Sequence, residues 1–439
     1  DMAVKLDEPL GRVAYVNARI LDPAEGWDGP GGVLTDGEKI VAAGPGLFDA
    51  GRPEDAKIID CQGACLAPGL VDIRAHLGEP GEEQKETLAS AGRAATAGGV
   101  TSLLCLPDTN PCIDDMSVVE FVARRARQLG LTKVYPYGAV TKRLAGKEIA
   151  ELKLLRDSGA LAFTDGVRTI ADPLVLRQAL AYAATFGLVI CHQAEEPSLA
   201  EGGVMNLGEN STRLGLAGIP REAEIIIIER DIRLVEMTGG RLHFVNVSTA
   251  ESVEIIRRAK DRGLAVTCDT APPYFSLNEH AIGDYRTFAK LTPPLRDEDD
   301  RQAIVRAISD GVIDCVASDH TPQDEESKRL PFAQAASGGV GLQTLLPMTL
   351  ELYHNGHLSL LKAIDLVTRA PAALMAMDAG RLKPEAPADL VLFDPDRSWK
   401  VSSDVLLSKS KNSPFDGRPV QGMVLRTVID GRTVHTHGA

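Results

Sequence analysis

Histidine and aspartate residues recur just after short apolar segments in the middle of the chain. His76 follows one such segment, His192 follows another, and Asp319 with His320 follows a third. Imidazole nitrogens and carboxylate oxygens are zinc ligands, and an aspartate beside a metal can also move a proton. One histidine at a strand end is often only a structural hydrogen bonder. Repetition at successive strand ends indicates a present or former metal site.

The elements that must position these residues alternate between short strands and helices. Strands are predicted at residues 69–73, 100–104, 133–137, 160–163, 188–191, 242–245, 265–268 and 312–317. This alternation predicts parallel βα units, and in a (β/α)8 barrel the residues beyond the strand ends form the active face. The residues expected on that face are Arg74, His76, Asp108, Asp165, His192, Asn246, Asp319 and His320.

Both ends of the chain are rich in strand patterns and contain few helical ones. Residues 13–20 and 39–43 read as strands near the start, and residues 388–393 and 423–429 read as strands near the end. We therefore predict one small β domain built from both termini. The expected boundaries are 1–67 and 385–439 for the β domain and 68–384 for the barrel.

The composition is that of a soluble globular protein. The net charge is −14, which disfavours binding to nucleic acid or to anionic membranes. The sequence contains no apolar run of membrane-spanning length and no visible secretory signal. Seven cysteines without a metal-type spacing suit reduced, core-packed thiols, so a cytoplasmic location is expected.

The ordered motifs of the chain resemble those of dihydroorotases, which are amidohydrolase-type TIM barrels. The matching motifs include Pro68-Gly69-Leu70-Val71-Asp72, Val247-Ser248-Thr249, Pro293-Pro294-Leu295-Arg296, Ala317-Ser318-Asp319-His320 and Gly341-Leu342-Gln343-Thr344. The resemblance spans almost the whole length. It implies a barrel that, in active members, holds a divalent metal, usually zinc, and hydrolyses a cyclic amide.

The metal positions implied by the resemblance are only partly kept. His76, His192, Asp165 and Asp319 are residual ligands, and Asp319 also matches the catalytic acid. Arg74 stands where the family's first histidine ligand is expected, and Asn246 stands where another is expected. A guanidinium has no lone pair for a metal, and an asparagine amide is a poor zinc donor. Losing such ligands weakens metal binding by at least the ~10–100-fold typical of lost outer-shell partners.

The positions that the resemblance assigns to the substrate carboxylate are also substituted. Gly78 replaces an arginine, Asp108 replaces an asparagine, and Gln323 replaces a histidine. Loss of one charged bidentate contact costs about 2–5 kcal/mol. These substitutions predict a vestigial site.

We therefore expect a non-catalytic dihydroorotase-like protein of pyrimidine biosynthesis without a cofactor. The resemblance implies that it serves as a structural partner of aspartate transcarbamoylase and forms a homo-oligomer. The alternative is an active, metal-dependent dihydroorotase or related cyclic amidohydrolase with a reduced metal site, which would use zinc. We further hypothesise that Arg74 replaces the missing cation beside Asp165 and Asp319; the alternative is that Arg74 extends into solvent.

Overall fold

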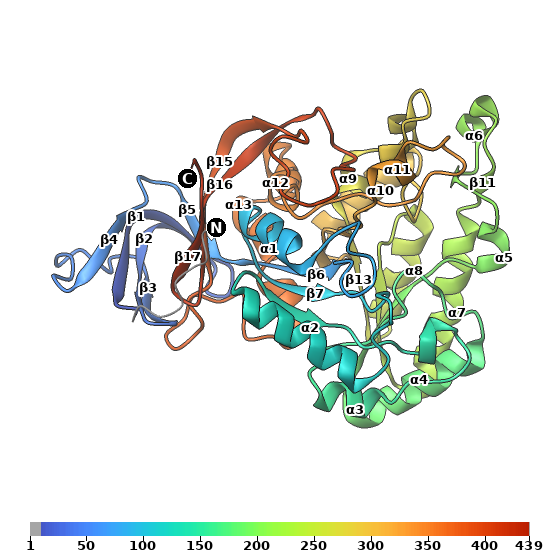
Figure 1. Ribbon diagram of the computed structural model, residues 1–439, viewed down its shortest axis with the longest axis horizontal. Coiled ribbons are helices and arrows are strands. Elements are labelled where there is room, and N and C mark those ends of the chain that lie inside the picture. Colours follow the sequence, from blue (N-terminus) through green and yellow to red (C-terminus); the bar gives the residue numbers. More distant parts are fainter. Residues whose placement is uncertain (1–9, 439) are drawn as a thin grey trace.

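The computed structural model describes residues 10–438 and divides into a β domain and a barrel (Figure 1). The β domain is one mixed sheet in the strand order β17-β16-β15-β5-β1-β2-β3, and β4 pairs with β1. Its strands are β1 (Arg12–Asp22), β2 (Trp27–Asp36), β3 (Lys39–Gly44), β4 (Ala56–Asp60), β5 (Cys65–Pro68), β15 (Leu390–Lys400), β16 (Pro419–Ile429) and β17 (Arg432–Thr436).

The two ends of the chain meet where β5 pairs with β15. The pairing is antiparallel and joins Leu390 to Pro68 and Phe393 to Cys65. Figure 1 shows the blue N-terminal strands beside the red C-terminal strands in this sheet. The prediction that both termini build one small β domain beside an α/β barrel is confirmed.

The barrel strands lie in two parallel sheets that are joined by single bridges. The strands are β6 (Leu70–Ala75), β7 (Val100–Cys105), β8 (Lys133–Pro136), β9 (Val189–Gln193), β12 (Arg241–Val245), β13 (Val266–Thr270) and β14 (Cys315–Val316). Phe163 bridges Gly138 and Ile190, and Ala75 bridges His320, which closes the ring. The expected strand at 160–163 is therefore reduced to the pairing of Phe163. The turn residues Thr164 and Asp165 follow at once.

Helices surround the barrel and fill the connections. They are α1 (Leu88–Ala97), α2 (Met116–Leu129), α3 (Leu152–Asp157), α4 (Pro173–Phe186), α5 (Pro197–Ala200), α6 (Glu209–Leu214), α7 (Glu222–Thr238), α8 (Ala250–Asp261), α9 (Pro272–Ser276), α10 (Glu298–Ser309), α11 (Glu325–Lys328), α12 (Leu345–His354), α13 (Leu360–Asp365) and α14 (Arg369–Leu374). Three 3-10 turns, Lys142–Leu144, Glu279–Ile282 and Thr287–Ala289, and a two-stranded pair, β10 (Met205–Asn206) with β11 (Gly218–Ile219), complete the elements.

Local sequence fixes the ends of these helices. Asp172 caps α4 by accepting a hydrogen bond from the Leu174 amide, Pro173 occupies the first helical position, and Gly187 ends the helix in the left-handed conformation. Within residues 10–438, no helix combines the length and apolarity needed to cross a bilayer.

Lys133 joins the barrel to the β domain through two carboxylates. Its ammonium lies 2.8 Å from Asp389 and 2.7 Å from Asp430. Asp389 is buried, and burial raises its pKa despite the nearby Lys133. Removal of Lys133 would therefore leave Asp389 buried without a counterion and destabilise the contact between the barrel and the β domain.

We predict that Lys133→Met lowers the free energy of unfolding by about 3 kcal/mol, because Asp389 loses its counterion in a buried setting. Denaturant unfolding measures the change. The matched control is Lys153→Met, whose partner Asp157 forms an exposed pair on α3, with an expected loss below about 0.5 kcal/mol. Equal losses in the two variants would contradict this role for Lys133.

Candidate functional site

Arg74 lies at the end of β6 with its guanidinium inside the protein. The side chain is buried, donates from Nε to Asp319 Oδ1 at 3.0 Å, and donates from Nη2 to Gln193 Oε1 at 2.7 Å. Burial alone lowers the pKa of Arg74, but the acids Asp319 and Asp269 outweigh it and the pKa is raised. We call the region around Arg74, His76, Asp108, Asp165 and Asp319, at the carboxyl ends of the barrel strands, the strand-end mouth. It contains the permanent positive charge of Arg74, which is paired with the Asp319 carboxylate.

His76 is enclosed by two carboxylates. Its Nδ1 lies 2.8 Å from Asp108 Oδ1, and its Nε2 lies 2.9 Å from Glu82 Oε2. Burial lowers the pKa of His76, but the two acids overcome this effect and raise it to about 10. The same contact lowers the pKa of Glu82 to about 2. His76 is thus an imidazolium that donates from both nitrogens, and it has no lone pair for a metal.

Asp165 and His192 also have protein partners. Asp165 accepts hydrogen bonds from the amides of Val140 and Thr141 at 2.9 and 3.0 Å. His192 Nε2 accepts from the Ile170 amide at 2.9 Å, so its Nδ1 carries the proton that it shares with Asp231 at 2.6 Å. The lone pair of His192 is therefore occupied by a backbone N–H.

Asn246 follows β12, and its side-chain amide lies near enough to the Asp319 carboxylate to lower the pKa of that group. Within the described part of the chain, both polar atoms of its amide are buried without a hydrogen-bond partner, and so is Gln193 Nε2. Asn246 and Asp319 both have φ of 52°, a left-handed conformation that non-glycine residues adopt at a cost. The mouth thus retains a strained, polar lining.

These donors do not fit a metal ion. Among the described residues, only His243, Asp269 and Cys315 bring three possible donor atoms within 4.8 Å of one another, and none of these is a predicted ligand position. That group is a hydrogen-bonded part of the barrel interior. His243 Nε2 lies 2.7 Å from Asp269 Oδ2, and Asp269 Oδ1 accepts a hydrogen bond from the main-chain N–H of Asn246. Burial raises the pKa of the Cys315 thiol well above its usual value.

Three cation–carboxylate pairs neutralise much of the charge of the mouth. Arg74 pairs with Asp319, His76 with Asp108, and Lys85 with Glu82 at 2.8 Å. Among the described residues, only hydrogen bonds from Val140 and Thr141 contact the carboxylate of Asp165, so a divalent ion would meet one acid there without a cationic partner. Coordination by Asp319 or His76 would require one of these pairs to break.

Protein groups also surround the three positions predicted to bind the substrate carboxylate, Gly78, Asp108 and Gln323. Gly78 has φ of +73°, and a Cβ at this position would lie 2.6 Å from the Glu86 carbonyl oxygen and 2.9 Å from that of Glu82. An arginine cannot occupy this position unless the turn opens. Asp108 is held by His76, and Gln323 donates from Nε2 to the Ser337 carbonyl at 2.8 Å.

The segment 78–86 is fixed over the mouth by Glu86. This buried carboxylate accepts from His320 Nε2 at 2.9 Å and from the Lys409 amide at 2.9 Å, and the Ser408 hydroxyl also donates to it. His320 Nδ1 accepts from the Gly341 amide, so the Nε2 proton points to Glu86. The turn above the site is therefore attached to both the last barrel strand and the C-terminal segment.

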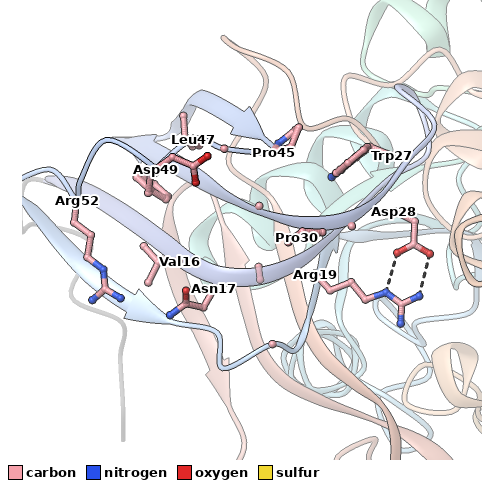
Figure 2. Close-up of a pocket in the computed structure, with 16 residues that line it drawn as sticks. Val16, Asn17, Arg19, Trp27, Asp28, Pro30, Pro45, Leu47, Asp49 and Arg52 are labelled. Atoms are coloured by element: carbon pink, nitrogen blue, oxygen red, sulfur yellow. Dashed lines mark hydrogen bonds and ion pairs between the residues drawn. The ribbon is translucent and has the colours of Figure 1, made fainter.

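One small cavity reaches Asp319 from the side of Pro272 and Phe415, and its volume of about 10 Å3 is room for about one water molecule. Small-molecule sites usually occupy about 300–1,000 Å3. A larger hollow of about 1000 Å3 lies in the β domain (Figure 2). There Arg19 and Asp28 are joined by hydrogen bonds of 2.8 and 3.0 Å, and none of the predicted site residues lines it.

The partners of the predicted site residues were not predicted from the sequence. Glu82 and Gln193 lack a recognisable spacing from the residues they bind. Asp231 did carry a signal, because it lies four residues after Ile227 on the buried face of α7, where an acid requires a partner. The buried pair of His243 and Asp269 was also not predicted.

Comparison with known proteins gives consistent matches over the whole chain. Residues 63–252 match the family model described as dihydro-orotase-like, and residues 247–435 match the model described as amidohydrolase family. A dihydroorotase of Anaplasma phagocytophilum is 43% identical over 426 residues, covering 96% of this chain and 95% of the relative. A dihydroorotase of Syntrophotalea carbinolica is 42% identical and covers 97% of this chain and 99% of the relative.

Solved structures support the same fold. The L-hydantoinase of Arthrobacter aurescens superposes with a TM-score of 0.88 at 25% identity, covering 98% of this chain and 97% of that protein. The dihydropyrimidinase of Brevibacillus agri gives a TM-score of 0.81 at 23% identity, covering 97% and 95%, which is evidence for the fold alone.

We predict that Arg74→Met destabilises the protein by roughly 3–5 kcal/mol at pH 7, because Asp319 loses its counterion. Burial already raises the pKa of Asp319 even though Arg74 opposes the shift. A raised carboxyl pKa favours folding at low pH and penalises it as the pH rises through the folded-state value. The deficit of the variant should therefore shrink as the pH falls towards about 4.

Denaturant unfolding of both proteins from pH 4 to pH 8 measures this difference. The double variant Arg74→Met/Asp319→Asn is the matched control, since it removes the stranded charge and should recover most of the loss at pH 7. A deficit that does not change with pH would contradict the electrostatic explanation.

Proposed function

The chain belongs to the dihydroorotase family, and we propose that it serves pyrimidine biosynthesis without hydrolysing dihydroorotate. The observation that carries this proposal is the contact of the Arg74 guanidinium with Asp319 in the mouth where the family places its metal. Asp319 occupies the position of the catalytic acid, and its carboxylate is engaged by a cation that cannot release a proton at physiological pH.

Energetics support the proposal. Metal binding through the residual donors requires Arg74 to leave Asp319 and requires His76, whose pKa is about 10, to lose a proton. It also requires His192 to release the Ile170 amide. Each step removes a buried, charge-assisted or fully formed hydrogen bond worth about 1–3 kcal/mol.

The names of the relatives favour the second candidate function. Proteins that are 43% and 42% identical are called dihydroorotases, which supports an active dihydroorotase or related cyclic amidohydrolase over the non-catalytic role. For this chain, that candidate needs a different arrangement of Arg74 and of segment 78–86, with zinc held by His76, His192, Asp165 and Asp319. Sequence similarity therefore supports the active candidate, whereas the contacts of Arg74 and His76 support the non-catalytic one.

For the purified chain we predict less than a stoichiometric amount of zinc and no hydrolysis of dihydroorotate above background, even with added zinc. Elemental analysis and a spectrophotometric ring-opening assay measure both. The control is the double variant Arg74→His/Asn246→His. It restores two imidazoles and should bind zinc at least about tenfold more tightly, yet remain inactive because Gly78 has no room for arginine. Metal-dependent turnover by the unsubstituted chain would establish the active alternative.

As the role that remains, we propose a structural partnership with aspartate transcarbamoylase in a homo-oligomeric assembly. Family resemblance and a folded barrel with a closed site support this idea. Size-exclusion chromatography with light scattering, using the transcarbamoylase of the same source, should show a joint peak at micromolar concentrations. Arg74→Met tests whether the vestigial site matters, because a stable variant should still enter the complex. Separate elution of the two proteins would contradict the partnership.

A further inference from the structure

A second cavity lies at the junction of the barrel and the C-terminal strands, away from the strand-end mouth. Its volume is about 200 Å3, and its lining includes Trp399, Pro347, Val424, His435 and His437. Strand β17 contacts α1 here, and β16 contacts α12. Figure 1 shows β17, in dark red, on the side of the β domain that faces the barrel.

His435 lies on the edge strand β17, and His437, two residues later, is the first residue after this strand. In an extended chain, such residues point to the same face with Cα atoms about 7 Å apart. His435 pairs with Thr427 of β16, whose hydroxyl donates to the Thr96 carbonyl of α1, so this face looks towards the barrel. The His437 amide donates to the Leu425 carbonyl at 2.9 Å, which continues the ladder beyond the strand.

The two imidazoles have unused binding capacity. Within residues 10–438, neither ring takes part in a hydrogen bond or ion pair, although both line the same cavity. The rings are close enough for His437 to influence His435, whose pKa is lowered by burial and by this neighbour. A neutral imidazole keeps one lone pair for a ligand.

We propose that His435 and His437 chelate one divalent transition-metal ion, such as Zn2+, Ni2+ or Cu2+, in this cavity. Two same-face imidazoles suit these ions, whereas Mg2+ and Ca2+ prefer oxygen ligands. The cavity leaves space for water molecules to complete the coordination. None of the predicted site residues lines this cavity, so this proposal is independent of the proposed function.

Trp399 provides a direct readout. Its indole lines the cavity and is fixed by a 2.8 Å hydrogen bond from Nε1 to the Gly422 carbonyl. The chain has only two tryptophans, so Trp27→Phe leaves Trp399 as the single reporter. Bound Ni2+ or Cu2+ should quench its fluorescence with saturation at one ion per chain, and calorimetry on the same samples gives the affinity.

The test compares His435→Asn, His437→Asn and the double variant with His280→Asn, all in the Trp27→Phe background. His280 is an exposed histidine outside the cavity and controls for nonspecific imidazole binding. Loss of either cavity histidine should weaken binding at least about tenfold, while His280→Asn should leave it unchanged. His437 is exposed, so its variant keeps the test valid if His435→Asn unfolds.

Binding that persists in the double variant would overturn the proposal, as would the absence of micromolar binding and of saturable quenching in the parent. Calorimetric binding at a single site without quenching would also overturn it, because the ion would then lie elsewhere.

Discussion

The buried contact between Arg74 and Asp319 governs the rest of the strand-end mouth. A guanidinium keeps its charge at every pH the protein meets and offers no lone pair, so it can neutralise a carboxylate but cannot activate water. Once that carboxylate is satisfied, the remaining donors form their own pairs. His76 lies between Asp108 and Glu82, and the result is a site in which most carboxylates have a cationic partner from the protein.

The fold and the site depend on different parts of the sequence. The barrel is stabilised by apolar strands and by helix caps such as Asp172, and neither of these requires particular residues at the predicted metal positions. Function depends on a few lone pairs at strand ends. The family relationship is therefore visible over nearly the full length of the chain, whereas the outcome at the mouth depends on where individual nitrogens point.

Much of the fold could be predicted from sequence because strand and helix periodicities are local. The segment at 160–163 shows the limit, since its four residues pair only through Phe163 before the chain turns. Residue types also identified the altered positions Arg74, Asn246 and Gly78. Their partners could not be found in the same way, because Glu82 and Gln193 reach the site through loop and side-chain conformations that no spacing rule describes.

The conformation of Gly78 limits which side chains can stand at this position. Its left-handed turn brings two main-chain oxygens to the place where a side chain would begin, and Glu86 secures that turn to distant parts of the chain. With a histidine at position 74, the strand-end mouth would still lack an arginine at position 78 to bind a substrate carboxylate. An arginine at position 78 would therefore require the turn of residues 78–86 to move together with the contacts of Glu86.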